Sequence, residues 1–334
     1  MAETTTLTLD EIETLAFDAL TRAGATAANA RPLARATAET EADGVASHGL
    51  AYIPVYCTHL GCGKVDGRAE PTVTRPRPGL VLADAAQGFA HGAIAAGFEA
   101  LTAAARDQGI AALAVFNSYN CGVLGVHTRA LAEAGLLGLG FTNAPASIAP
   151  SGGSQAVVGT NPISLAAPDG AGGVALMIDQ SASRIAKSEI MKHAREGRAI
   201  PEGWALGPDG QPTTDPKTAL EGTMMPAGGY KGVGLALIVE VMAAAMTGAV
   251  LGIDASPFSG TKGGPPRTGQ MFIAIDPAAS SRGLFADRIT RLVAAIRAQP
   301  GARLPGDGRA AARARARREG VAVSTETLRR IAAI

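Results

Sequence analysis

The first residues that could do chemistry form the short stretch Ser47-His48-Gly49, which follows a predicted helix. His48 is one of only five histidines in the chain, and an imidazole with an ordinary pKa of about 6.5 gives and accepts protons near neutral pH. Ser47 could orient this ring or a substrate oxygen. The stretch therefore predicts a general acid or base, and a histidine that only caps a helix end is the open alternative.

A second kind of candidate site consists of glycine-dense turns that carry polar residues. They are APSGG at 149–153, GTNP at 159–162 and PAGGYKGVG at 226–234. Each one alone is typical of an ordinary turn. Together, with Lys231 ahead of an apolar helix, they could bring backbone N–H groups and an ammonium group close to phosphates. The chain has no Gly-x-Gly-x-x-Gly or P-loop motif, so neither a Rossmann nor a P-loop site is predicted.

Composition and charge exclude several classes of function. The 334 residues include 30 basic and 29 acidic side chains, so no nucleic-acid partner is expected and the arginines of 309–318 are read as a solvated helix face. Three cysteines and the lack of a signal peptide favour a cytoplasmic protein. The histidines show no metal-ligand spacing, so no metal is expected.

One long apolar segment, residues 232–253, resembles a membrane span in length. Glu240 lies near its middle, where a carboxylate would cost about 2 kcal/mol or more in a bilayer. The segment is therefore predicted to be a helix buried in the protein or at a subunit interface, and no membrane is expected.

The elements that must position these residues follow from periodicity and turn signals. Thr8 and Glu11 form a capping-box pattern ahead of a first helix, and a second helix is predicted over residues 26–43. Further helices are predicted over residues 53–64, 91–108 and 125–134, and proline-rich coil over 71–78. The strand-like runs VVGT, ISLAAP and VALMID follow one another too closely for helical crossovers, which predicts a mixed α/β fold with a partly antiparallel sheet.

The motifs also occur in an order that resembles a known family. SHGL, NAP, APSGG, GTNP, MIDQSAS, REGRAIPEGWAL, PDGQPTTDP, GGYKG, GQMFIAIDP and LPGD are similar to those of the malate/L-lactate dehydrogenase family, which is distinct from the Rossmann dehydrogenases. The resemblance covers roughly residues 8–330 and implies a non-Rossmann, sulfolactate dehydrogenase-like fold. It implies a helical part in 1–75, a mixed-sheet cofactor domain in 76–250, and a segment, 251–334, that returns to the helical part.

The same resemblance implies an activity and roles for individual residues. The family members are homodimeric oxidoreductases that use NAD or NADP, and the histidine that matches His48 exchanges a proton at the substrate carbonyl. The residues implied to bind the cofactor are Asn143, Thr160, Asn161, Pro162, Asp179, Gln180, Ser181, Ser183, Lys231 and Gly232, with Gly306 and Asp307 closing the pocket.

The sequence departs from the family pattern at two positions. Tyr52 stands where members commonly carry an arginine suited to a substrate carboxylate, and Asn120 stands where many have a catalytic histidine. A phenol has one donor and no charge, so it cannot replace a bidentate guanidinium. Plain malate or lactate is therefore not the expected substrate. Tyr119 and Asn120 could polarise the substrate carbonyl, and Arg184 or Lys187 could bind its anionic group or be ordinary exposed cations.

Three functions remain open from the sequence. The first is reversible hydride transfer between NAD(P)H and a small 2-oxo acid, such as sulfopyruvate. The second is reduction of a cyclic ketimine such as Δ1-piperideine-2-carboxylate or Δ1-pyrroline-2-carboxylate, because an imine nitrogen also needs a proton from His48. The third is a degenerate protein that binds the cofactor without catalysis. The choice between NAD and NADP is also open.

Overall fold

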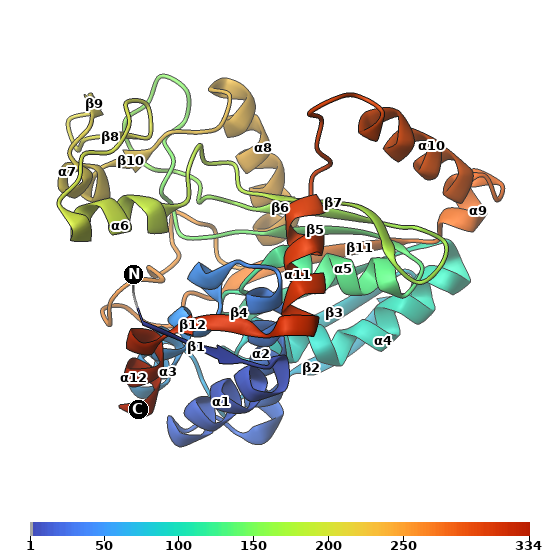
Figure 1. The fold of residues 1–334 in the computed structure, drawn as a ribbon, viewed down its shortest axis with the longest axis horizontal. Helices are drawn as coiled ribbons and strands as arrows, with labels where there is room; N and C mark the ends of the chain where they lie inside the picture. The colour runs from blue at the N-terminus through green and yellow to red at the C-terminus, as the bar shows by residue number, and fades with distance from the viewer. Residues whose placement is uncertain (1–2) are drawn as a thin grey trace.

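A computed structural model describes residues 3–334 of the chain. The two ends of the chain meet in one helical part (Figure 1). Strand β1 (Thr4–Leu7) pairs antiparallel with β12 (Val321–Ser324), close to both termini. The predicted capping box is confirmed, since Thr8 and Glu11 bond each other's backbone N–H groups at the start of a helix. The helices of this part are α1 (Leu9–Arg22), α2 (Ala27–Ala42), α3 (Ile53–Gly61), α11 (Asp307–Glu319) and α12 (Thr325–Ala332).

A seven-stranded sheet with the order β2-β3-β4-β11-β5-β6-β7 forms the rest of the core. Only β3 and β4 are parallel neighbours, so the predicted mixed sheet is confirmed. Its central strand β11 belongs to residues 251–334, which join the sheet before they reach the helical part. The strands are β2 (Thr72–Arg77), β3 (Leu80–Asp84), β4 (Ile110–Ser118), β5 (Leu137–Thr142), β6 (Ile163–Pro168), β7 (Val174–Gln180) and β11 (Thr268–Ile275).

Helices cover both faces of this sheet. Successive side chains of a strand point to opposite faces, so Leu113 of β4 packs in the core under α4 (Ala90–Gln108), while Ala114 joins a second core under Val239 of α8 (Tyr230–Glu240). Helix α5 (Leu124–Glu133) lies against β5 and β6. The remaining elements are α6 (Lys187–Glu196), β8 (Ala205–Leu206), β9 (Pro212–Thr213), α7 (Pro216–Glu221), β10 (Thr223–Met224), α9 (Pro277–Ser281) and α10 (Phe285–Arg297).

Two local predictions are wrong. Most of the stretch 71–78 forms the edge strand β2 (Thr72–Arg77) rather than coil, and Pro76 is tolerated because it lies where the register shifts between Thr74 and Arg77. The run VVGT forms no strand, because only the isolated bridge between Ile148 and Val158 is made there. Strand β2 forms because it pairs with the next strand, β3, a pairing that the proline-rich composition does not indicate.

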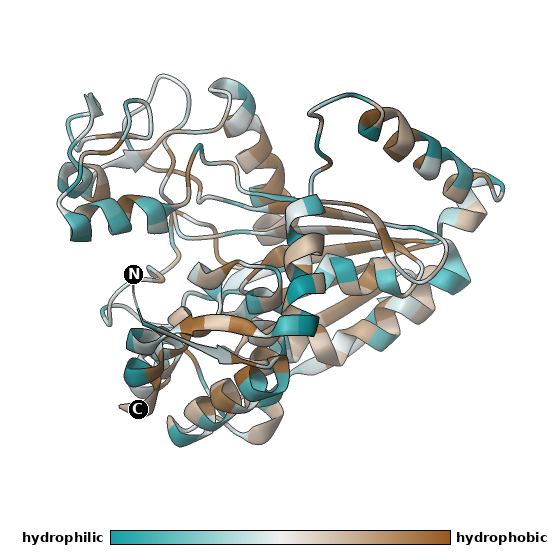
Figure 2. Cartoon of the chain, viewed as in Figure 1, coloured by the Kyte–Doolittle hydropathy of each residue, from teal (hydrophilic) through white to brown (hydrophobic). Residues whose placement is uncertain are grey.

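The long apolar segment does not continue as one regular α-helix. Helix α8 ends at Glu240, and a five-residue π-helical stretch, Val241–Ala245, follows it. Within residues 3–334, no helix has both the length and the hydropathy needed to cross a bilayer. Figure 2 shows apolar residues along α8 on the outside of the molecule.

Candidate active site and cofactor cavity

The turn that carries His48 is held in place by a buried carboxylate, Glu41. The backbone N–H of Leu50 donates a hydrogen bond to Glu41 Oε1 over 2.7 Å. Burial raises the pKa of Glu41, and the hydrogen bond from Leu50 opposes that rise. A Cβ on Gly49 would lie 2.2 Å from the same oxygen, so only glycine lets the turn rest on this side chain.

We therefore expect Gly49→Ala to displace the turn. Accommodating the added methyl group should cost about 1–3 kcal/mol of stability, because neither the turn nor Glu41 has free space. His48 moves with the turn, so if its ring is the predicted proton donor, kcat should fall more than cofactor affinity. Denaturant unfolding and steady-state kinetics check this, and Gly308→Ala is the control because a Cβ there meets nothing within 4 Å.

The predicted general acid or base, His48, has one ring nitrogen bonded to its neighbour Ser47. Ser47 Oγ lies 2.9 Å from His48 Nδ1, which leaves Nε2 as the nitrogen available to a substrate. His48 keeps solvent contact. The protein packed around its ring is nevertheless the main cause that lowers the pKa of His48. The charge of Asp179 raises this pKa, and the charge of Arg309 lowers it. Asp179 and Arg309 form an ion pair at 2.6 Å. An imidazole can give a proton when it is charged and accept one when it is neutral.

A chain of contacts connects the predicted residues His48, Tyr52 and Asn120. The rings of His48 and Tyr52 are nearly parallel, at 6° and 6.1 Å between centroids. Tyr52 contacts Tyr56 edge-on at 4.8 Å, and the Tyr56 hydroxyl donates to Asn120 Oδ1 over 3.0 Å. Tyr119 differs, because its side chain is fully buried and its hydroxyl contacts His59 rather than an open space.

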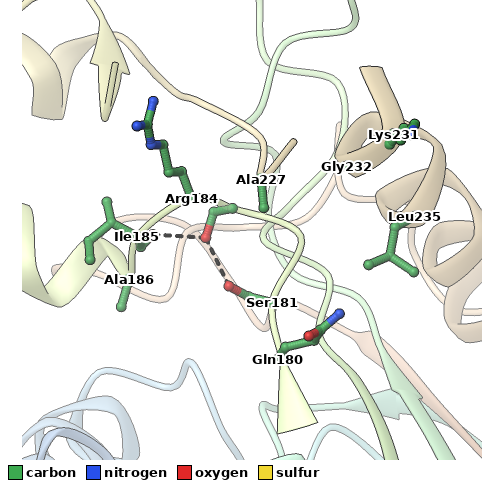
Figure 3. A pocket seen from close by; sticks show the side chains of 10 residues that line it. Gln180, Ser181, Arg184, Ile185, Ala186, Ala227, Lys231, Gly232 and Leu235 are labelled. Carbon is green, nitrogen blue, oxygen red and sulfur yellow. Dashed lines mark hydrogen bonds between the residues drawn. The ribbon is translucent and has the colours of Figure 1, made fainter. Parts of the chain in front are cut away.

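Six predicted residues line one cavity of about 500 Å³ between the end of β7 and the start of α8 (Figure 3). Ser181 Oγ lies 2.9 Å from Ser183 Oγ, which donates to the carbonyl of Ile185. The guanidinium of Arg184 extends away from Ser181 in Figure 3. Lys187 is exposed at the start of α6 and does not line the cavity. The six lining residues are Gln180, Ser181, Ser183, Arg184, Lys231 and Gly232.

The cavity fits the anionic part of a dinucleotide. A Cβ on Gly232 would lie 2.2 Å from the carbonyl oxygen of Ala227, so glycine brings the start of α8 against the loop. The amino end of a helix attracts phosphate through its free N–H groups and dipole. Lys231 is exposed there and supplies a cation. Hydroxyls, backbone donors and one ammonium group are therefore gathered at the place where phosphates would lie.

Asn143 and Asn161 are fixed by a carboxylate that sequence reasoning missed as a site residue, Glu240. Glu240 Oε2 accepts from Asn161 Nδ2 over 2.7 Å, and Oε1 accepts from the backbone N–H of Gly252 over 2.7 Å and from Asn143 Nδ2 over 3.5 Å. The oxygen of each amide accepts a backbone N–H. Both asparagine side chains are thus buried and committed to holding the loops together.

The neighbours of Asn161 connect these loops to the cavity and the sheet. The carbonyl of Thr160 accepts from the backbone N–H of Ala182, which stands between the two cavity serines. The carbonyl of Pro162 accepts from the N–H of Thr142 at the end of β5. The GTNP turn therefore sets the position of the cavity wall through its backbone.

The last predicted pair, Gly306 and Asp307, starts helix α11 beside β7. Gly306 has a φ of +91° and would place a Cβ 2.9 Å from the carbonyl of Met177. Asp307 pairs with Arg297 at 3.0 Å. Two residues further on, Arg309 reaches Asp179, a contact that sequence reasoning missed because no motif marks this arginine. Helix α11 thus connects strand β7 to the helical part.

Comparisons with known proteins find relatives that match nearly the whole chain. The chain is 40% identical to a Δ1-pyrroline-2-carboxylate reductase from Ancylobacter novellus, over 97% of this chain and 95% of the relative. It is 42% identical to a (2R)-3-sulfolactate dehydrogenase (NADP(+)) from Chromohalobacter salexigens, over 92% and 91%. The crystal structure of Δ1-piperideine-2-carboxylate reductase from Pseudomonas syringae superposes with a TM-score of 0.92 at 34% identity, covering 98% of both chains.

A family model described as malate/L-lactate dehydrogenase matches residues 7–332. This match spans the helical part, the seven-stranded sheet and the return of the chain through α12. The predicted non-Rossmann, sulfolactate dehydrogenase-like fold is confirmed, because the sulfolactate dehydrogenase of Methanocaldococcus jannaschii superposes with a TM-score of 0.87 at 26% identity over 98% of this chain and 95% of that one. The chain belongs to the malate/L-lactate dehydrogenase family of oxidoreductases.

Proposed function

We propose that this protein uses a reduced nicotinamide cofactor to reduce a small cyclic ketimine that carries a carboxylate, of the Δ1-pyrroline-2-carboxylate type. The observation that carries this proposal is the Ser47–His48 pair, beside the neutral phenol of Tyr52 and within the electrostatic reach of Asp179. Asp179 precedes Gln180, which lines the cavity. Relatives named as Δ1-pyrroline-2-carboxylate reductases support the same substrate class.

In this proposal, the protein supplies geometry and a proton, and the bound cofactor supplies the hydride. Ser47 fixes the ring of His48 through Nδ1, so Nε2 gives a proton to the imine nitrogen as the ring carbon is reduced. Residues 180–183 with Lys231 and Gly232 bind the phosphates. Thr160 and Pro162 hold the backbone of the wall near the nicotinamide, with Asn143 and Asn161 buried behind them.

The phenol of Tyr52 favours a substrate without net charge. A cyclic imine with a carboxylate becomes a zwitterion once its nitrogen is protonated. A neutral hydrogen-bond donor is enough to bind the carboxylate of such a zwitterion. A 2-oxo acid keeps its negative charge and is better bound by a guanidinium. The second candidate is nevertheless a 2-oxo acid such as sulfopyruvate, which the relative named as a sulfolactate dehydrogenase favours.

Absorbance at the reduced-nicotinamide band tests the proposal. NADH and NADPH are supplied in parallel with Δ1-pyrroline-2-carboxylate, Δ1-piperideine-2-carboxylate and a series of 2-oxo acids that includes sulfopyruvate. Turnover with the cyclic imines supports the proposal and identifies the coenzyme. Turnover with 2-oxo acids alone establishes the second candidate, and cofactor binding without any turnover establishes a non-catalytic binder.

We further propose that the protein is a homodimer through the outer face of α8 and the π-helical stretch. Tyr230 is 72% exposed, Ile238 55% and Met246 64%. Large apolar side chains that are exposed repeatedly along one helix support a protein interface there, and a closed two-fold dimer is the commonest way to cover one. The proposed interface would lie next to the proposed cofactor cavity, because Lys231 of the same helix lines that cavity.

The double variant Leu237→Lys/Ile238→Glu is expected to be monomeric. Charges in the centre of an apolar interface are costly to bury, so association should weaken at least about 100-fold, equivalent to roughly 3 kcal/mol. Light scattering coupled to size-exclusion chromatography gives the mass. Leu292→Lys on α10 is the matched control, because Leu292 is 51% exposed against 48% for Leu237. A double variant that stays dimeric would place the interface elsewhere.

A further inference from the structure

A second cavity, which we call the helix cavity, has a volume of about 820 Å³ and lies between the helical part and the helices that cover the sheet. Its walls come mainly from α2, α4 and α5, and the last turn of α11 adds one residue. Helix α2 contacts each of the other three helices. None of the residues that the sequence predicts for substrate or cofactor lines this cavity. Cavities of this size hold small organic ligands in many proteins.

The wall formed by α4 and α5 is largely apolar and contains one histidine. Ile94, Phe98 and Val126 line it, together with His91. His91 is only 3% exposed, and its Nδ1 has no hydrogen-bond partner within residues 3–334. Buried polar atoms almost always have a partner, so a ligand that hydrogen-bonds with this ring would satisfy an atom that the described chain leaves unpaired.

The ring of His91 is neutral. Burial is the main cause that holds the pKa of His91 well below its ordinary value, and the nearby His127 lowers it further. A neutral imidazole has one nitrogen that donates and one that accepts. A ligand hydroxyl both donates and accepts, so it is the simplest group that suits Nδ1 in either tautomer.

The wall formed by α2 and α11 carries arginines. Arg31, Arg35 and Arg317 line the cavity, and none of the three forms an ion pair with another residue of the range 3–334. The guanidinium of Arg31 lies over the ring of Phe17, 4.8 Å from its centroid. Arg35 and Arg317 are exposed and have no such contact with an aromatic ring in the described chain.

The other charged groups that line the cavity largely neutralise one another. Arg129 pairs with Glu39 and Glu133, and also with the buried Asp43 behind them. Glu13 is the one lining carboxylate for which the described residues provide no ion pair. Three guanidinium groups without an acidic partner therefore stand against a single carboxylate, and this surplus of positive charge favours an anionic ligand.

Helix α11 shows that Arg317 differs from the arginines before it. Arg309, Arg313 and Arg317 follow one another at intervals of four residues, so they lie on one face of the helix. Arg309 pairs with Asp179 and Arg313 with Asp43, each at 2.6 Å. These two ion pairs fix the earlier turns of α11. Arg317 continues the same face, and it lines the cavity instead of meeting an acidic residue of the described chain.

We propose that the helix cavity is a second ligand site, which binds an organic carboxylate whose apolar body carries a hydroxyl group. The carboxylate pairs with Arg35 and Arg317, the apolar body packs on Ile94 and Phe98, and the hydroxyl hydrogen-bonds with His91. Guanidinium groups are well suited to a carboxylate because they offer paired donors and a charge. The site is separate from the proposed active site and does not depend on the proposed function.

Three related probes test which parts of the ligand matter. 6-Hydroxy-2-naphthoate has the carboxylate, the apolar body and the hydroxyl, 2-naphthoate lacks the hydroxyl, and 2-naphthol lacks the carboxylate. Isothermal titration calorimetry should give the tightest binding for 6-hydroxy-2-naphthoate. Loss of the carboxylate should raise Kd at least about 10-fold, and loss of the hydroxyl about 3- to 10-fold. No binding of the full probe, or equal binding of all three, would overturn the proposal.

An arginine variant locates the bound probe. Arg35→Gln/Arg317→Gln should raise the Kd of 6-hydroxy-2-naphthoate at least about 10-fold and change that of 2-naphthol less than about 2-fold. Arg288→Gln/Arg315→Gln is the matched control, because both residues are exposed and outside the cavity and the loss of charge is equal. An equal effect of the two variants would show that only the net charge of the protein attracts the probe.

Two further measurements separate this site from the others. In His91→Leu, 6-hydroxy-2-naphthoate and 2-naphthoate should bind equally well, because the group that reads the hydroxyl is gone. Saturating NADH or NADPH should not compete with the probe, since the cofactor cavity has other lining residues. Competitive displacement by the cofactor would assign the probe to the cofactor cavity and overturn the proposal. The probe series in the wild type decides the role of the hydroxyl even if His91→Leu does not fold.

Discussion

Replacement of His48 by Gln is expected to lower kcat for reduction about 10²- to 10⁴-fold, the usual contribution of a positioned general acid. Glutamine can still accept from Ser47 but has no transferable proton at neutral pH. The cofactor cavity is formed by other residues, so the Kd of the nicotinamide cofactor, measured by fluorescence, should stay the same. This combination of lost turnover and retained binding is specific to the proposed role.

The proposed role of His48 also predicts how the rate of reduction changes with pH. In the proposed mechanism, reduction needs the protonated ring of His48, and burial holds the pKa of this ring below its ordinary value of 6.5. The kcat/KM for reduction should therefore be constant at pH values below that lowered pKa and fall as the pH rises through it. Oxidation of the product needs the neutral ring, so its rate should rise over the same range. His48→Gln should abolish this limb and leave only ionisation of the substrate.

His193→Gln is the control for these measurements. His193 belongs to α6 and bonds the carbonyl of Ala199 over 2.7 Å, outside the proposed site. Its replacement should leave both kcat and the pH profile unchanged. A His48→Gln enzyme with wild-type turnover would show that another group delivers the proton, even though the fold and the cofactor cavity were right.

Local signals predicted most of the fold but not how the sheet is completed. The capping box at Thr8 and the helix over 26–43 depend on neighbouring residues, and both form as expected. Strand β11 lies between β4 and β5, more than a hundred residues away along the chain. No periodicity marks which antiparallel partner a strand will choose, since the partner depends on packing of both faces.

The site shows the same division. Motifs placed Gln180, Ser181, Lys231 and Gly232 together in advance, and these four do line one cavity. The carboxylates that fix the loops could not be found in this way, because a lone glutamate in an apolar segment has no motif. In the sequence, Glu240 argues only against a membrane span. In the structure, its carboxylate oxygens accept hydrogen bonds from Asn143 and Asn161, which belong to two of the predicted motifs. Its role depends on distances between segments that are remote in sequence.

Loss of Glu240 is therefore expected to have the largest effect on stability. In Glu240→Ala, the buried N–H of Gly252 loses its partner, and the amides of Asn143 and Asn161 each lose one acceptor. Unsatisfied buried groups and the cavity left by the side chain should together cost about 3–5 kcal/mol. The shift of the urea midpoint at an unchanged m-value measures this loss.

Two further variants make the cause specific. Glu240→Gln keeps the shape and one acceptor oxygen but places an NH₂ group against existing donors, so it should lose about 1–3 kcal/mol, less than alanine does. Glu202 is exposed, so Glu202→Ala should change stability by no more than about 0.5 kcal/mol. If Glu240→Ala were as stable as Glu202→Ala, the loops around Asn143 and Asn161 would have to be held by packing alone. Because these loops form the wall behind the proposed nicotinamide site, the same variant should also weaken cofactor binding, while His48→Gln should not.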